Sequence, residues 1–111
     1  MTLGFDPDMR VLTFKGLFPG VDPRSAMVAQ LKALVDARKS RDLPAHKRLD
    51  ARRAKAACLV RRGDFSLTMS IRGQYYEYAV QKALNLVNEL FLLLHETYPD
   101  YLVEHFGLSA E

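Results

Sequence analysis

A run of basic side chains between residues 38 and 62 is the first feature of this sequence that suggests a binding chemistry. It holds ten of the sixteen lysine and arginine residues of the chain, with only two acidic residues among them. Such density is typical of surfaces that bind nucleic-acid phosphates, because each contact releases a counterion. The residues predicted to make these contacts are Arg38, Lys39, Arg41, Lys47, Arg48, Arg52, Arg53, Lys55, Arg61 and Arg62.

The same basic run lacks the residues that read a nucleotide sequence. It contains no aromatic side chain to stack on a base, no set of zinc ligands and no helix-turn-helix spacing. The sequence therefore predicts sequence-independent phosphate binding at most. A second interpretation, which we favour, is a solvated loop or a contact with an acidic protein. The acidic partner is then the last third of a second copy, because residues 63–111 carry seven acidic and two basic side chains.

A second candidate site lies in the segment "IRGQYYEYA", where a predicted strand passes into a predicted helix. Glycine permits close approach of the backbone, and a helix N-terminus favours an anion. A small anionic ligand would be bound there, and packing of aromatic rings at the boundary of two elements is the simpler alternative. The candidate ligand-binding residues are Arg72, Gly73, Gln74, Tyr75 and Tyr78.

Residue types suited to metal binding or catalysis are present without the required spacing. His95 and Glu96 are neighbours, as are Glu104 and His105, and adjacent helical side chains point about 100° apart. Neither an HExxH metal motif nor a GxSxG nucleophile motif occurs, and the single Cys58 is predicted to face the core. We therefore predict no metal, no cofactor and no catalytic residue, and favour a binding role over an enzyme. The lone cysteine suits a cytoplasmic protein.

The elements that position these residues begin with a predicted hairpin around Gly63-Asp64. After this turn, apolar and polar residues alternate over residues 65–71, which is typical of a strand with one exposed face. Closing the hairpin at Arg62 and Phe65 predicts a register and an apolar face. In this register the apolar face pairs Val60 with Leu67, Cys58 with Met69 and Ala56 with Ile71.

The remaining elements follow from their start and stop signals. A strand is predicted over residues 9–16, then a helix capped by Asp22 with Pro23 in its first turn. A long helix begins near Gly73 and stops before Pro99, and a short helix closed by Gly107 follows it. The sequence predicts an α+β fold, a two-layer α/β sandwich of order β-α-β-β-α-α with about three strands. It forms one domain over residues 1–111, with a mobile basic insertion at about 40–56.

The long helix has more apolar surface than a three-stranded sheet can cover. One stripe, centred on Val87, is predicted to face the sheet, and Tyr76 is assigned to it. A second stripe is predicted to mediate self-association, most simply as a homodimer. No stretch is apolar enough for a membrane span, so we expect no membrane partner. We expect the protein to be a non-catalytic interaction module. The predicted self-association residues are Tyr75, Ala79, Leu86 and Leu93.

Overall fold

The computed structural model describes residues 2–6, 10–38, 48–50 and 52–107. Within them the elements follow the order β-β-α-β-β-α-α. The elements are β1 (Thr2–Asp6), β2 (Val11–Phe18), α1 (Ala26–Ala37), β3 (Ala54–Arg61), β4 (Asp64–Ile71), α2 (Tyr76–Thr97) and α3 (Pro99–Phe106).

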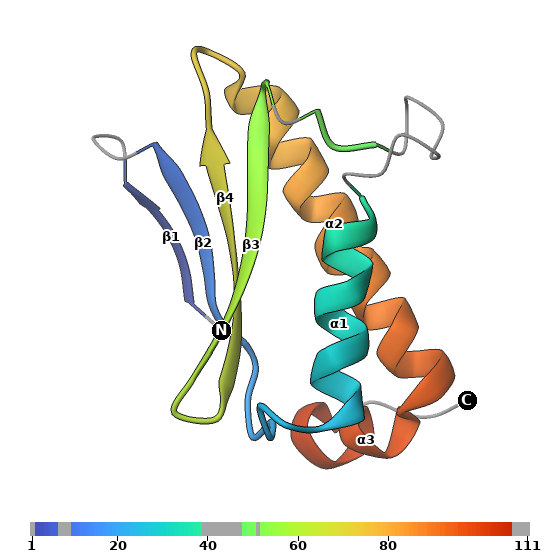
Figure 1. Ribbon diagram of the computed structural model, residues 1–111. Coiled ribbons are helices and arrows are strands. Elements are labelled where there is room, and N and C mark those ends of the chain that lie inside the picture. The colour runs from blue at the N-terminus through green and yellow to red at the C-terminus, as the bar shows by residue number, and fades with distance from the viewer. Residues whose placement is uncertain (1, 7–9, 39–47, 51, 108–111) are drawn as a thin grey trace.

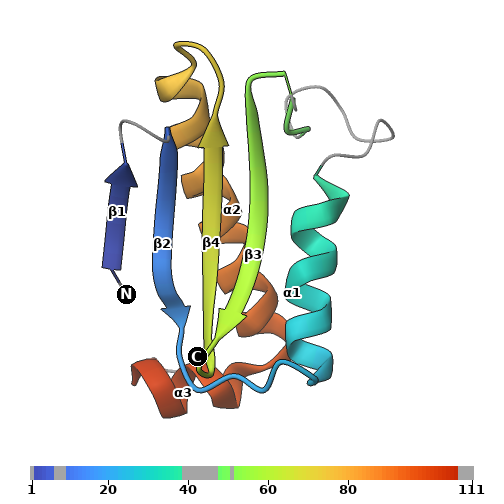
Figure 2. The same cartoon turned by 60° about the vertical axis from the view of Figure 1, so that its left-hand side comes forward.

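The four strands form one antiparallel sheet in the order β1-β2-β4-β3, with β1 and β3 at its edges (Figure 2). The α+β class and the two layers agree with the sequence prediction, but the sheet has one strand more than expected. The additional strand is β1, whose five residues TLGFD pair with the first half of β2. Its glycine and its short length give too weak a pattern for recognition without its partner.

All three helices lie on one face of the sheet, as Figure 1 shows. Helix α1 contacts β3, and α2 crosses β4 and β3, so the interior lies between these helices and the inner face of the strands. The largest fully buried side chains include Phe18 and Phe65 from the sheet and Leu31 and Leu90 from the helices. The other face of the sheet is uncovered among the described residues and carries small and polar side chains, including Thr13, Ser66, Thr68 and Ser70.

The β3–β4 hairpin was predicted correctly in type but not in register. Arg61 pairs with Asp64, so Arg62 and Gly63 form the turn, with φ angles of 53° and 79°. Val60 consequently lies opposite Phe65 and Cys58 opposite Leu67. The register differs by two residues from the predicted one, and a shift of two keeps every side chain on its predicted face. The alternation therefore identified the buried face without fixing the partners.

Two of the predicted helix boundaries are corrected by the structure. Ser25, not Asp22, caps α1, and its Oγ accepts a hydrogen bond from the backbone N–H of Val28. Asp22 instead accepts hydrogen bonds from Arg24 and Ser25 in the preceding turn. Helix α2 starts at Tyr76, three residues after Gly73, whereas α3 ends at a left-handed Gly107 as predicted.

The orientation of α2 also differs from the prediction. Ala79 and Leu86, assigned to the self-association stripe, are buried within the protomer, and Leu93 is half-buried. Tyr76, which was predicted to lie in the core, is 37% exposed, and Val80 and Leu84 are also exposed. The difference arises because α3 folds back onto the second half of α2, where Phe106 packs against Phe91 at 5.6 Å between ring centroids. The first half of α2 has no such cover from α3.

Candidate functional site

Four arginines lie at the end of the sheet where β4 passes into α2. Because β4 lies between β2 and β3, the residues that precede those two strands flank the segment that follows β4. The carbonyl of Arg10 accepts a hydrogen bond from the N–H of Ile71, and the carbonyl of Arg53 accepts one from the N–H of Arg72. Arg10 also donates to the carbonyl of Gly73 at 3.2 Å. Arg10, Arg52 and Arg53 thus flank the segment after β4, which itself contains Arg72.

Asp50 organises two of these arginines. Its carboxylate accepts a hydrogen bond from the N–H of Arg52 at 2.9 Å and lies 3.5 Å and 3.6 Å from the Nε atoms of Arg52 and Arg53. The backbone hydrogen bond, helped by the two guanidinium charges, holds the pKa of Asp50 below its ordinary value. One carboxylate therefore balances only part of the positive charge in this cluster.

Two tyrosine rings at the start of α2 complete the arrangement. The guanidinium carbon of Arg53 lies 5.2 Å from the ring centroid of Tyr75 and 5.2 Å from that of Tyr78. These distances are within the range of cation–π interactions. Tyr75 remains 47% exposed, while Tyr78 is half-buried and also lies near the ammonium of Lys82. We call Arg10, Arg52, Arg53, Arg72, Tyr75 and Tyr78 the arginine–tyrosine cluster.

The cluster borders an open hollow of about 270 Å³ lined by Asp50, Arg52, Arg53 and Tyr75. A comparable hollow, of about 240 Å³, lies between the end of α1 and the middle of α2. Both are smaller than the usual pocket for a drug-sized molecule. The second hollow is lined by Arg38, Leu49, Lys82, Asn85, Leu86, Asn88 and Glu89.

The arginine–tyrosine cluster unites two sites that the sequence presented separately. Arg52 and Arg53 come from the basic run, and Arg72, Tyr75 and Tyr78 come from the strand–helix junction. The aromatic side chains missing from the basic run are thus supplied by a segment some twenty residues further along the chain. Sequence reasoning missed Arg10 and Lys82, because only the order of the strands and the path of α2 bring them near. Gln74 is exposed beside the cluster.

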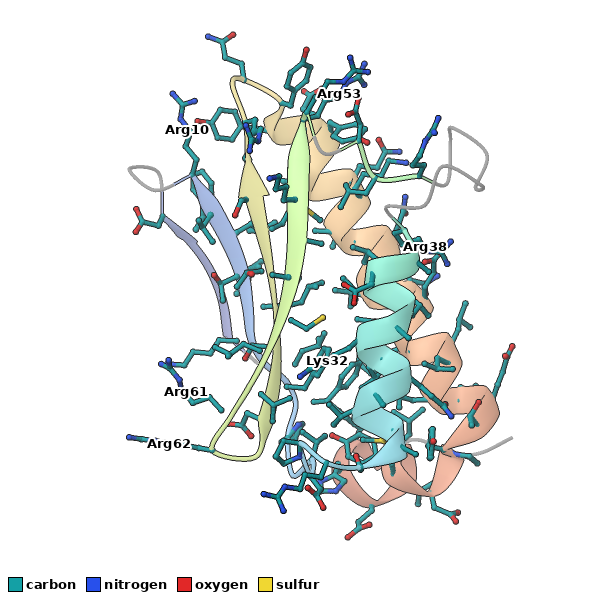
Figure 3. The ribbon with its side chains drawn as sticks, in the orientation of Figure 1. Arg10, Lys32, Arg38, Arg53, Arg61 and Arg62 are labelled. Atoms are coloured by element: carbon teal, nitrogen blue, oxygen red, sulfur yellow. The ribbon has the colours of Figure 1, made fainter. Side chains whose placement is uncertain are left out.

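The ten basic residues proposed as a phosphate surface do not form one surface. Arg61 and Arg62 lie at the opposite end of the β3–β4 hairpin from Arg53, about 25 Å away along the strand (Figure 3). Arg38 caps α1 and forms an ion pair with Glu89, and Lys55 projects from the uncovered side of β3. Arg48 is half-buried, and Lys39, Arg41 and Lys47 lie outside the described residues.

The described part of the predicted insertion at about 40–56 contacts the rest of the fold. Residues 39–47 and 51 lie outside the described residues, but the N–H of Leu49 donates to the carbonyl of Arg38 at 2.7 Å. Leu49 is 4% exposed, and the Tyr78 hydroxyl accepts a hydrogen bond from the N–H of Asp50 at 2.9 Å. From Ala54 the chain is strand, so Lys55 lies in β3. Tyr78 therefore anchors residues 48–50, which precede β3.

A separate surface feature is an exposed apolar patch formed by β1 and the first half of α2. Leu3 is 60% exposed, and Phe5, Val80 and Leu84 are also largely uncovered. An edge-to-face contact between Phe5 and Tyr76, with centroids 5.9 Å apart, joins the strand part to the helix part. We call Leu3, Phe5, Tyr76, Val80 and Leu84 the apolar patch.

Histidines and carboxylates are scattered in the part of the chain that the structure describes. No group of three or more His, Cys, Asp or Glu side chains suited to a metal ion occurs there. His105 stacks on the ring of Tyr101 at 4.4 Å between centroids. Cys58 is half-buried on the inner face of β3. Among the described helices, none is both long and apolar enough to cross a membrane.

Comparison with known proteins adds no relationship to these observations. Neither a protein-family model, nor a curated protein, nor a solved structure matches the chain.

Proposed function

We propose that this protein is a non-catalytic interaction module that self-associates through the apolar patch. The observation that carries the proposal is the exposure of five large apolar side chains from two elements that touch at Phe5 and Tyr76. Together they present on the order of 400 Å² of apolar surface, a size at which a patch on a small protein commonly marks an interaction site. The proposal keeps self-association through the long helix and moves it to a different face.

A second copy of the chain is the partner that fits this surface. Strand β1 lies at the edge of the sheet, and an edge strand can pair with a further strand along its outer side. Antiparallel pairing of two β1 strands about a two-fold axis keeps the inner faces of both strands on one side. Leu3 and Phe5 of both copies would then form one apolar surface between the two α2 helices. The patch is thus complementary to itself.

The test measures the mass in solution, by sedimentation or light scattering, over micromolar concentrations. We expect a species of twice the 12.6 kDa mass of the chain. Leu84→Glu places a charge in the patch. We expect its dimer dissociation constant to rise at least tenfold, because a loss of about 1.4 kcal/mol in binding free energy is enough for that change. Leu84 is 55% exposed, so circular dichroism and thermal unfolding of the variant are expected to remain close to those of the parent.

Leu92→Glu is the matched control, because Leu92 lies on the same helix and is 48% exposed outside the patch. It is turned by about 80° from Leu84 about the helix axis. The proposal requires that Leu92→Glu leave the dimer intact. A parent protein that is monomeric at high micromolar concentration, or equal dissociation by the two glutamates, overturns it.

A further inference from the structure

We infer that the arginine–tyrosine cluster binds single-stranded nucleic acid, with its arginines on the phosphates and Tyr75 stacked on a base. This inference concerns the end of the sheet and does not depend on self-association. It narrows the basic surface suggested by the sequence to a site built from three segments around the β4–α2 connection.

A local excess of positive charge favours the binding of phosphates at this end of the sheet. The cluster contributes four guanidinium groups, and Lys82 adds an ammonium beside Tyr78. Against them stand Asp50, the exposed Glu77 in the first turn of α2, and the exposed Asp6, which pairs with Val11 beside Arg10. The side chain of Arg52 is 93% exposed and that of Arg53 is 47% exposed, so both remain open to a phosphate. Solvent-exposed ion pairs contribute little, so the contacts with Asp50 hold these arginines only weakly against a competing anion.

The exposed ring of Tyr75 favours a single strand over other polyanions. Tyr75 is exposed beside the phosphate-binding side chains, and the structure gives its hydroxyl no hydrogen bond to a described residue. Single-strand binders combine a positively charged track with aromatic rings on which unpaired bases stack. In a duplex the bases already stack on each other, and an acidic peptide offers no ring to Tyr75. The pairing of Arg53 with Tyr75 therefore favours an unpaired strand.

The local fold gives this site a fixed geometry. Arg53 is held through its carbonyl by Arg72 and through its N–H by Asp50, and Tyr78 holds Asp50 in turn. Gly73, with φ of 56°, allows the tight turn that places Tyr75 next to Arg53. The arginines are therefore presented from structured backbone, which reduces the entropy lost on binding.

The experiment measures fluorescence anisotropy of a labelled single-stranded oligothymidine, and of the same strand in a duplex, from low to physiological salt. We expect the single strand to bind more tightly at low salt and to weaken steadily as salt rises. Tyr75→Leu is expected to lower affinity about tenfold, whereas Tyr75→Phe, which keeps the ring, retains it. Arg52→Ala with Arg72→Ala is expected to weaken binding and to reduce the dependence on salt, by about 0.7 per lost phosphate contact.

The matched control is Arg61→Ala with Arg62→Ala, which removes the same charge at the far end of the hairpin (Figure 3). It is expected to change affinity much less than the pair in the cluster. Equal losses from the two pairs would mean that only overall charge matters, and would overturn the inference. Three other results would also overturn the inference. The first is displacement of the labelled strand by polyglutamate or inorganic phosphate as readily as by unlabelled strand. The others are tighter binding of the duplex than of the single strand, and no binding at low salt.

Discussion

The hydroxyl of Tyr78 accepts a hydrogen bond from the backbone N–H of Asp50 at 2.9 Å, and so ties the start of α2 to the segment that enters β3. The same hydroxyl lies 3.5 Å from the carbonyl of Arg48, and the N–H of Leu49 bonds to Arg38. The chain thus returns from the basic insertion at a fixed point. The position of Arg52 and Arg53 follows from this contact.

Replacement of Tyr78 by Phe should therefore loosen the segment without removing the ring from Arg53. We expect the free energy of unfolding to fall by about 1 kcal/mol, because a half-buried N–H loses its partner. Urea denaturation measures this change, and hydrogen exchange at the Asp50 amide should become faster.

The control is Tyr75→Phe, since the hydroxyl of Tyr75 has no hydrogen-bond partner among the described residues. Its unfolding free energy should change by less than about 0.5 kcal/mol. Equal effects of the two substitutions would show that the Tyr78 hydroxyl does not anchor the segment.

The turn of the β3–β4 hairpin supplies a second prediction, because Arg62 adopts a left-handed conformation with φ of 53°. Asparagine tolerates this conformation better than arginine, and Asn-Gly is a preferred pair for such a turn. Arg62→Asn should raise the unfolding free energy by about 0.5 to 1 kcal/mol. Thermal unfolding at constant pH measures the gain.

Arg61→Asn serves as the comparison, because Arg61 lies in the extended strand opposite Asp64. Asparagine is disfavoured in strands, so this variant should be no more stable than the parent. Stabilisation by Arg61→Asn alone would contradict the observed register and favour a turn displaced along the sequence.

These residues also show how far the sequence predicts the fold. Alternation over residues 65–71 reports the buried face directly, because side chains on a strand point to opposite sides in turn. It does not report the strand partner, since a shift of two residues preserves every face. Choosing Gly63-Asp64 as the turn, instead of Arg62-Gly63, therefore produced the wrong register with the right core.

Non-local contacts account for what the sequence did not predict. The apolar arc of α2 is wide enough for two orientations, and the choice is made by α3, which packs on Phe91. The arginine–tyrosine cluster depends on the sheet order, which places Arg10 and Arg53 on either side of the segment after β4. The sequence around Tyr76 contains no sign of the packing of α3, and the sequence around Arg10 contains no sign of the strand order.

A close approach between α3 and the connection after β2 gives a third prediction. Gly20 has φ of 65°, and a Cβ atom there would lie 2.5 Å from the Cε1 atom of His105. Gly20→Ala therefore adds a steric clash to the strain of a left-handed alanine. The clash is with the tip of an exposed side chain that can turn aside by giving up its stacking on Tyr101. We therefore expect a loss of about 1 to 2 kcal/mol in unfolding free energy, measured by denaturant titration.

Gly107→Ala isolates the strain, because Gly107 has φ of 64° and nothing lies within 4 Å of an added Cβ. Its loss should be close to 1 kcal/mol. His105→Ala should restore part of the stability of Gly20→Ala in a double-mutant cycle. Equal losses at the two glycines, with no coupling to His105, would contradict the close approach.

The alkaline stability of the fold should depend on Tyr101, whose hydroxyl donates a hydrogen bond to the carbonyl of Pro19. Burial, with the nearby carboxylate of Asp64, raises the pKa of Tyr101 above its ordinary value of 10.0. Above that pH the unfolded chain loses this proton while the folded protein keeps it, so the unfolding free energy falls as pH rises. In Tyr101→Phe this contribution is absent, and urea denaturation between neutral and alkaline pH should show a shallower decline than in the parent. Parallel declines would contradict the assignment.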